Sequence, residues 1–272
     1  QLSSDCPYDS ITPDQIDANS AREINLCAAE EQIVLLKNDG MLPLRKPKRL
    51  VVCGPLADEN LMDWYTGYFR DEVSVLNGVR TEFPDAEICT DSLWDIVSVQ
   101  AANGKYLSVH PDGSCAFDAV SVTETEQFML QDWGENWQNL FALQSQRYLR
   151  AAEDGTLCLH HRRIYDWFTH ETFRLLDTPD GTLLESPFHH KRMETDAVGT
   201  IRFTAQTAVT PEQTFRIRMI SRGAERAERL AADADAVIYC TGNHPVQVAK
   251  ECFDRKTLAL NIQPHMAERL YR

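Results

Sequence analysis

One short stretch near the end of the chain, residues 250–255, concentrates charged groups that could carry out acid–base chemistry. It reads Lys-Glu-Cys-Phe-Asp-Arg, so Glu251 stands beside a lysine and three positions before Asp254. A carboxyl group in such a loop can give up and take back a proton while a neighbouring bond breaks. The alternative is that Glu251 is a surface carboxylate paired with Lys250 or Arg255, and the residues alone leave both interpretations open. We expect Asp254 and Arg255 to form an internal ion pair that supports the loop.

Residue types that bind metals or form disulfides are present, but their spacing fits neither role. The eight cysteines stand singly, without a C-x-x-C pair, and two of them, Cys53 and Cys240, fall in apparent core strands. The adjacent pairs His160-His161 and His189-His190 would point to opposite faces of a strand. We therefore predict no metal site and no cofactor, and we expect buried thiols in a reducing compartment.

An α/β framework would position these residues. Asn19-Ser20 can cap a helix through residue 28, and the continuous apolar run 49–55 is typical of a strand covered on both faces. Alternating helices and covered strands predict a mostly parallel sheet, whose carboxyl-end loops share one edge. The remaining elements expected on this basis are a strand at 33–36, a helix at 224–234 and a strand at 236–240.

Between residues 95 and 221 the pattern changes to short alternating strands, and it repeats. Glycines recur at 113, 155 and 199, and phenylalanines at 128, 173 and 215, so three copies of about 42 residues are present. Three copies of four short strands with a repeated aromatic favour a β-trefoil, in which the phenylalanines form a shared core. A propeller is the competing repeat fold, but it usually needs more than three blades.

The composition excludes several kinds of partner. A net charge of −14, from 27 basic and 41 acidic side chains, would repel a nucleic-acid backbone. No long apolar run suggests a membrane span. We therefore expect a soluble globular protein without nucleic-acid or membrane partners.

Several stretches of the α/β segment together resemble the C-terminal domain of family 3 glycoside hydrolases. The run IVLLKNDGMLPL at 33–44 is the most specific of them. The supporting stretches are VCGPLAD at 52–58, DWYTG at 63–67, GNHP at 242–245 and KECFDRKTLAL at 250–260. The insertion is similar to fascin-like β-trefoils, chiefly in NGKYLS at 103–108.

The resemblance implies a fold and a division into domains. The fold class it implies is α/β plus all-β, namely a mostly parallel α/β sandwich, incomplete in this chain, interrupted by a β-trefoil insertion. The expected parts are an interdomain linker at 1–19, a discontinuous α/β domain at 20–94 and 222–272, and the trefoil at 95–221. The family's N-terminal barrel would precede the linker.

The resemblance also implies an activity, retaining hydrolysis of β-glucosides or β-xylosides, with a slight preference for the xylosidase type. Two carboxyl groups perform such chemistry. Glu251 matches the proposed acid/base, whereas the nucleophilic Asp belongs to the barrel, so we expect this chain by itself to be inactive. The expected partners are a glycoside or oligosaccharide substrate and the barrel domain. A bacterial-type cytoplasmic location is expected, in line with the reducing compartment that the singly spaced cysteines favour.

The resemblance further suggests substrate-binding residues. Trp64 and Tyr65 follow strand 49–55 on a loop at the same sheet edge as Glu251, where aromatic rings can stack on a sugar. Packing against the barrel domain is an equally good interpretation of both. His244, in the GNHP stretch, is the third candidate. The alternative function is a carbohydrate-binding module in which the trefoil binds glycan.

Overall fold

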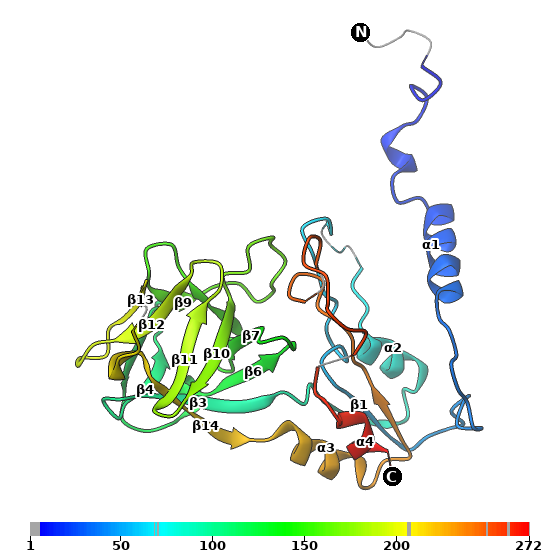
Figure 1. Ribbon diagram of the computed structural model, residues 1–272. Coiled ribbons are helices and arrows are strands. Elements are labelled where there is room, and N and C mark those ends of the chain that lie inside the picture. Colours follow the sequence, from blue (N-terminus) through cyan, green and yellow to red (C-terminus); the bar gives the residue numbers. More distant parts are fainter. Residues whose placement is uncertain are drawn as a thin grey trace. The chain divides into compact units, whose positions relative to one another are not determined.

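The computed structural model describes residues 6–67, 69, 71–205, 208–248, 250–259 and 262–271. The chain forms two compact units, residues 1–45 and 46–272, and each is described by itself (Figure 1). Residues 1–5 of the expected linker, and residue 260 at the end of the family-like stretch, lie outside the described part.

The first unit contains a short 3-10 helix, η1 (Pro13–Gln15), and the helix α1 (Asn19–Glu31). The predicted helix is confirmed, but its cap is not. Ala18 precedes the first turn, and no side chain caps the helix. The predicted strand at 33–36 is wrong, because no strand pairs with these residues in the described part of the chain. An apolar run becomes a strand only where a neighbouring strand accepts its hydrogen bonds.

The second unit contains a parallel sheet in the order β15-β1-β2. Its strands are β1 (Arg49–Cys53), β2 (Glu87–Asp91) and β15 (Ala236–Tyr239). Both pairings are parallel, so the predicted parallel arrangement is confirmed.

Helices cover both faces of this sheet, which explains the unbroken apolar run of β1. Val51 and Cys53 pack with Ala227 of α3 (Gly223–Ala231) and Met266 of α4 (Met266–Leu270). Val52 faces the other way and packs with Leu76 of α2 (Val75–Glu82). Strand residues alternate between two buried faces, so each must be apolar.

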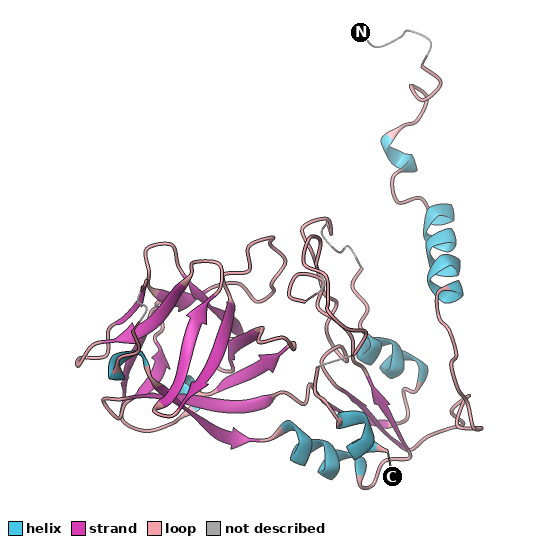
Figure 2. Ribbon diagram, viewed as in Figure 1, coloured by secondary structure: helices cyan, strands magenta, loops and turns pink. Residues whose placement is uncertain are grey.

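Between β2 and α3 the regular structure is antiparallel strands joined by loops, with two short 3-10 helices (Figure 2). Six strands (β3, β6, β7, β10, β11 and β14) pair in a ring and close a barrel. The other six form three hairpins, β4-β5, β8-β9 and β12-β13. Their bounds are β3 (Asp95–Ala101), β4 (Tyr106–Val109), β5 (Cys115–Ala119), β6 (Phe128–Asp132), β7 (Gln138–Ala142), β8 (Arg147–Ala151), β9 (Leu157–Leu159), β10 (Thr172–Thr178), β11 (Gly181–Ser186), β12 (Lys191–Thr195), β13 (Ile201–Thr204) and β14 (Phe215–Ser221). Short 3-10 helices η2 (Glu124–Glu126) and η3 (Pro211–Gln213) precede β6 and β14.

The repeated residues occupy equivalent places in this barrel. The three phenylalanines, Phe128, Phe173 and Phe215, are fully or almost fully buried in one apolar core, as predicted. The three repeated glycines all have positive φ in turns, at 85°, 85° and 101°. The threefold pattern of the sequence is therefore a threefold pattern of the structure.

The barrel and the parallel sheet are joined at the two ends of the segment between β2 and α3. β3 begins shortly after β2, and β14 leads directly into α3, while β3 and β14 pair with each other. The backbone amide of Gly223 donates to Asp95 Oδ1 at 2.8 Å. Arg226 of α3 donates to both carboxylate oxygens of Asp91, at 2.7 and 3.1 Å. These bonds fix the strands that enter and leave the barrel against the sheet.

None of the described helices is both long and apolar enough to cross a membrane.

Candidate active site

The carboxyl ends of the three parallel strands meet at one edge of the sheet. Cys53 pairs in register with Tyr239 on one side and with Asp91 on the other. Gly54, with φ of 100°, turns the chain away from this edge, and its amide donates to the carbonyl of Asp91 at 2.9 Å. A Cβ at Gly54 would lie 2.5 Å from the carbonyl oxygen of Cys240. Glycine is therefore required where the β1 and β15 loops leave together.

Asp63 shapes the loop that follows β1. Its Oδ1 accepts hydrogen bonds from the amides of Tyr65 and Thr66, both at 2.9 Å, and from the Thr66 hydroxyl at 2.8 Å. The hydroxyl bond, followed by the amide bonds, lowers the pKa of Asp63. This turn presents Trp64 and Tyr65 from a fixed backbone.

The structure brings Tyr65 and Glu251 together. The Tyr65 hydroxyl donates to Glu251 Oε2 at 2.8 Å, although both side chains are exposed. Within the described residues Glu251 forms no ion pair with Lys250 or Arg255, so the surface-pair interpretation does not describe this loop. Oε1, the other carboxylate oxygen of Glu251, accepts no hydrogen bond from any residue that the structure describes.

Trp64 points the other way and contacts the antiparallel barrel that the strands β3 to β14 build. Its ring meets Trp167 edge to face, with centroids 4.5 Å apart, and it packs beside Ile164 and Val246. Trp64 is half-buried, whereas Tyr65 is 74 % exposed. Of the two aromatics, Tyr65 is the one available to a ligand at this edge.

Lys250 anchors the Glu251 loop in an aromatic box. Its ammonium donates to the carbonyl of Trp167 at 2.6 Å, and it lies over the rings of Phe188 at 4.7 Å and Phe253 at 5.1 Å. Trp137 and Trp167 complete the box at 5.9 and 5.5 Å. Lys250 is only 2 % exposed, and this burial lowers its pKa to about 8. The rings and the carbonyl act in the opposite sense and favour the ammonium.

Asp254 and Arg255 do not form the expected ion pair within the described residues. The Arg255 guanidinium instead donates to Asn243 Oδ1 at 3.0 Å and to the carbonyl of Ala259 at 3.2 Å. Both acceptors belong to the loop that follows β15, so these bonds satisfy the guanidinium without the Asp254 carboxylate. Arg255 thus cross-links this loop, while the structure gives Asp254 no comparable contact.

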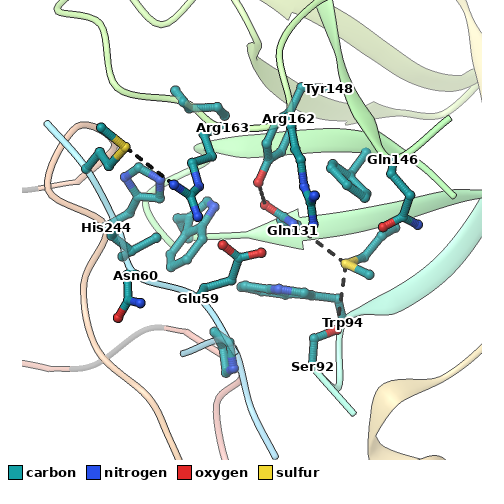
Figure 3. A pocket seen from close by; sticks show the side chains of 17 residues that line it. Glu59, Asn60, Ser92, Trp94, Gln131, Gln146, Tyr148, Arg162, Arg163 and His244 are labelled. Carbon is teal, nitrogen blue, oxygen red and sulfur yellow. Dashed lines mark hydrogen bonds between the residues drawn. The ribbon is translucent and has the colours of Figure 1, made fainter. Parts of the chain in front are cut away.

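His244 lies away from the Tyr65–Glu251 pair and lines a separate cavity (Figure 3). It is 3 % exposed, and its Nδ1 accepts the amide of Val246 at 3.2 Å. Burial lowers the pKa of His244 to about 3, so the ring is neutral at any ordinary pH. Trp133 meets it edge to face, with centroids 4.8 Å apart.

The histidine pairs differ from their sequence-based prediction. His160 and His161 follow β9 in a loop, and their ring centroids are 4.0 Å apart, so they do not point to opposite faces of a strand. A loop does not impose the alternation of a strand. In the described part of the chain, no three potential metal-ligating side chains come together.

The cysteines are free thiols, as predicted, but fewer are buried than expected. Cys53 is buried, Cys27 and Cys252 are exposed, and the other five are half-buried.

Residues 33–271 match the family model described as the glycosyl hydrolase family 3 C-terminal domain. This span covers most of the chain. The chain belongs to glycosyl hydrolase family 3. It also resembles an exo-1,4-β-xylosidase, xlnD, of Emericella nidulans, with 44 % identity over 79 residues. That match covers 28 % of this chain and 10 % of the xylosidase, so the aligned part spans about a tenth of the relative.

Two solved structures resemble part of this family 3 chain. The designed threefold-symmetric protein ThreeFoil has a TM-score of 0.41 and 19 % identity, over 46 % of this chain and 99 % of its own. Cry35Ab1 has a TM-score of 0.41 and 12 % identity, over 48 % of this chain and 37 % of its own.

Two residues of this family 3 chain escaped the sequence analysis. Lys250 was considered only as a possible partner of Glu251, because nothing local shows that three distant aromatics join Phe253 around it. Glu59 was not considered at all, yet its carboxylate lies in the His244 cavity (Figure 3). The neighbouring VCGPLAD stretch was the only signal near it.

Proposed function

We propose that this chain is part of a retaining β-glycosidase of the β-glucosidase or β-xylosidase type, and that Glu251 is its acid/base. The observation that carries the proposal is the Tyr65–Glu251 hydrogen bond at the carboxyl edge of the parallel sheet. Such edges are where ligands bind in open α/β sheets. The family membership supplies the reaction class.

The chemistry needs one carboxyl group that is protonated and another that is ionised. Glu251 would protonate the leaving glycosidic oxygen and then take a proton from the attacking water. The nucleophilic carboxylate would come from the barrel domain and face Glu251 at about 5 Å in a retaining enzyme. Tyr65 would hold one oxygen of Glu251, so that the other faces the scissile bond.

The surrounding side chains fit this role. Tyr65 is exposed and can line the site for the leaving group. Trp64 fixes the same loop against the antiparallel barrel of this chain through Trp167. Lys250 and Arg255 hold the loop on either side of Glu251. The resemblance to a xylosidase favours a xyloside over a glucoside.

Glu251→Gln in the complete enzyme tests the acid/base role. The amide cannot donate an acidic proton, so hydrolysis of xylosides with poor leaving groups should fall by roughly a thousandfold. Activated aryl xylosides, which leave without protonation, should retain a normal first step. Equal rates to wild type on both substrates would rule out this role for Glu251. Turnover of an aryl β-xyloside by residues 1–272 alone would rule out the nucleophile's location in the barrel domain.

We also propose that residues 95–221 are a β-trefoil inserted into a discontinuous α/β domain. The closed six-stranded barrel, the three hairpins and the threefold phenylalanine core support this interpretation. The sequence Gln131-Asp132-Trp133 is similar to the Q-x-W triplet of ricin-like lectin trefoils, but its structure gives no support to a glycan-binding role. Gln131 and Trp133 are buried, and Gln131 accepts a hydrogen bond from Tyr148 at 2.9 Å. We favour a role for the insertion in holding the Glu251 loop.

A further inference from the structure

A cavity of about 130 Å³ lies where the antiparallel barrel meets the loops of the parallel sheet (Figure 3). The sheet contributes Glu59 and His244 from the loops after β1 and β15. The barrel contributes Gln131 and Tyr148 and, from the loop after β9, Arg162. Neither Glu251 nor Tyr65 lines this cavity.

His244 offers a hydrogen-bond donor to the cavity. Its Nδ1 accepts the amide of Val246, so the neutral ring must carry its proton on Nε2. Nε2 makes no hydrogen bond to the described residues, and it is not fully enclosed by protein, so its proton is available to the cavity. Trp133, which lines the same cavity, has a fully buried Nε1 without a partner among the described residues. A buried polar group without a partner is costly, and a ligand atom that accepts the Trp133 proton would remove the cost.

Glu59 offers an acceptor. Its carboxylate has no hydrogen bond to another described residue, and Figure 3 shows it within the ring of lining side chains. The residue is exposed toward the opening, yet the surrounding protein desolvates the carboxylate and raises the pKa of Glu59. Arg163 and Arg162 oppose the rise. Arg163 is already paired with Glu72, so Arg162 is the cation left beside the opening.

The walls between these groups are aromatic. Trp94 and Trp133 meet edge to face, with centroids 5.1 Å apart, and Phe141 and Tyr148 pack beside the same space. Aromatic walls with a few convergent polar groups are typical of small-molecule sites. They suit a ligand with both an apolar face and polar edges.

We infer that this cavity binds the ring of a neutral pyranose. A hydroxyl group can donate to the Glu59 carboxylate, and another can accept from His244 Nε2, whereas the ring's apolar face can lie on an indole. An anionic ligand would meet the Glu59 charge, and a cationic ligand would meet Arg162 and find only a donor at His244. A cavity of about 150 Å³ holds one benzene molecule, which has fewer heavy atoms than a pentose, so a pentose would enter this cavity of about 130 Å³ only in part and leave the rest of its ring at the opening.

Calorimetric titration of the full chain with D-xylose tests the inference. D-glucuronate serves as the anionic probe of similar size. We expect saturable D-xylose binding in the millimolar range and weaker or absent D-glucuronate binding. Loss of a hydrogen bond to a charged group should weaken D-xylose binding roughly tenfold in Glu59→Ala. Glu59 is exposed, so this variant should fold normally, which its urea midpoint verifies.

Glu251→Gln is the matched control, since it changes another exposed carboxylate outside the cavity. It should bind D-xylose as the wild type does. Three outcomes would each overturn the inference: no saturable heat with D-xylose, unchanged affinity in Glu59→Ala, or stronger binding of D-glucuronate than of D-xylose. The cavity would then be a site for water molecules. This result is independent of the proposed hydrolysis, because Glu251→Gln would remove activity from the complete enzyme without changing this binding.

Discussion

Tyr65 and Glu251, 186 positions apart, share a hydrogen bond of 2.8 Å. The bond joins the loops that follow β1 and β15, and it would hold one carboxylate oxygen while the other stays open to solvent. A phenol that donates to a carboxylate restricts its rotation. The relationship therefore makes Tyr65 a positioning residue for the proposed acid/base.

Tyr65→Phe should lower kcat for xylosides with poor leaving groups up to roughly tenfold, because the Glu251 carboxylate loses a charge-assisted hydrogen bond. Steady-state kinetics of the complete enzyme measure this effect. Stability should not change, since both groups are exposed. Tyr271→Phe, which removes the hydroxyl of another exposed tyrosine, is the control. Equal kcat values for the two variants would contradict the positioning role.

Lys250→Met should change how stability depends on pH. Burial lowers the pKa of Lys250 to about 8 in the folded chain, from 10.5. Between these values the unfolded chain binds more protons, so this lysine makes stability rise with pH from about 8 to 10.5. The contribution is at most about 3.5 kcal/mol, since one pKa unit is worth about 1.4 kcal/mol. Below pH 8 the lysine is charged in both the folded and the unfolded chain, so it no longer makes the free energy of unfolding depend on pH.

Urea unfolding of the wild type and Lys250→Met across this range provides the comparison. In Lys250→Met the free energy of unfolding should not show the rise that Lys250 causes between pH 8 and 10.5. The pH dependence that other lysines and the tyrosines cause should remain. Its neutral side chain still fills the aromatic box, so it should fold. Parallel stability curves for the two proteins would show that Lys250 titrates as it does in the unfolded chain.

Gly54→Ala should destabilise the protein more than Gly104→Ala does. Both glycines have positive φ, at 100° and 82°, so both variants carry about 1 to 3 kcal/mol of backbone strain. A Cβ at Gly54 would also approach the carbonyl of Cys240 to 2.5 Å, whereas nothing lies within 4 Å of one at Gly104. Urea midpoints measure the difference. Equal losses would mean that the β1 and β15 loops move apart without cost.

Phe173→Ala should lower the free energy of unfolding by about 3 to 5 kcal/mol, because it empties a fully buried site in the barrel core. Phe168→Ala removes the same atoms from a side chain that is 59 % exposed and should cost less than about 1 kcal/mol. Chemical denaturation of both variants makes the comparison. A loss at Phe173 as small as at Phe168 would contradict a shared aromatic core.

The sequence identified the elements whose signal is local. The apolar run of β1, the helix and strand before the β15 loop, and the threefold phenylalanines all have patterns that burial requires. The run at 33–36 has an equally apolar pattern but pairs with no described strand, because pairing depends on a neighbour that the run itself does not encode. The prediction for His160 and His161 was wrong for the same reason, because it assumed that both lie in a strand.

The candidate site was predictable only in part. Tyr65 and Glu251 both follow parallel strands, so the sequence predicted that they lie at the same edge of the sheet. The structure joins them by a hydrogen bond. The aromatic box of Lys250 draws on three separate barrel loops, so no local spacing reports it. The hydrogen bonds of Arg255 to Asn243 and Ala259 likewise depend on how the loop folds back. These bonds are found in place of the expected ion pair with Asp254.

The most direct test of the account is to trap the intermediate in Glu251→Ala of the complete enzyme. An activated aryl xyloside should still form the glycosyl-enzyme, but water would no longer be deprotonated, so turnover should stall. Azide needs no base and should restore turnover, with β-xylosyl azide as the product identified by NMR. The account predicts that product with retained configuration. Wild-type turnover without azide, or no azide product, would contradict the assignment of Glu251 as the acid/base.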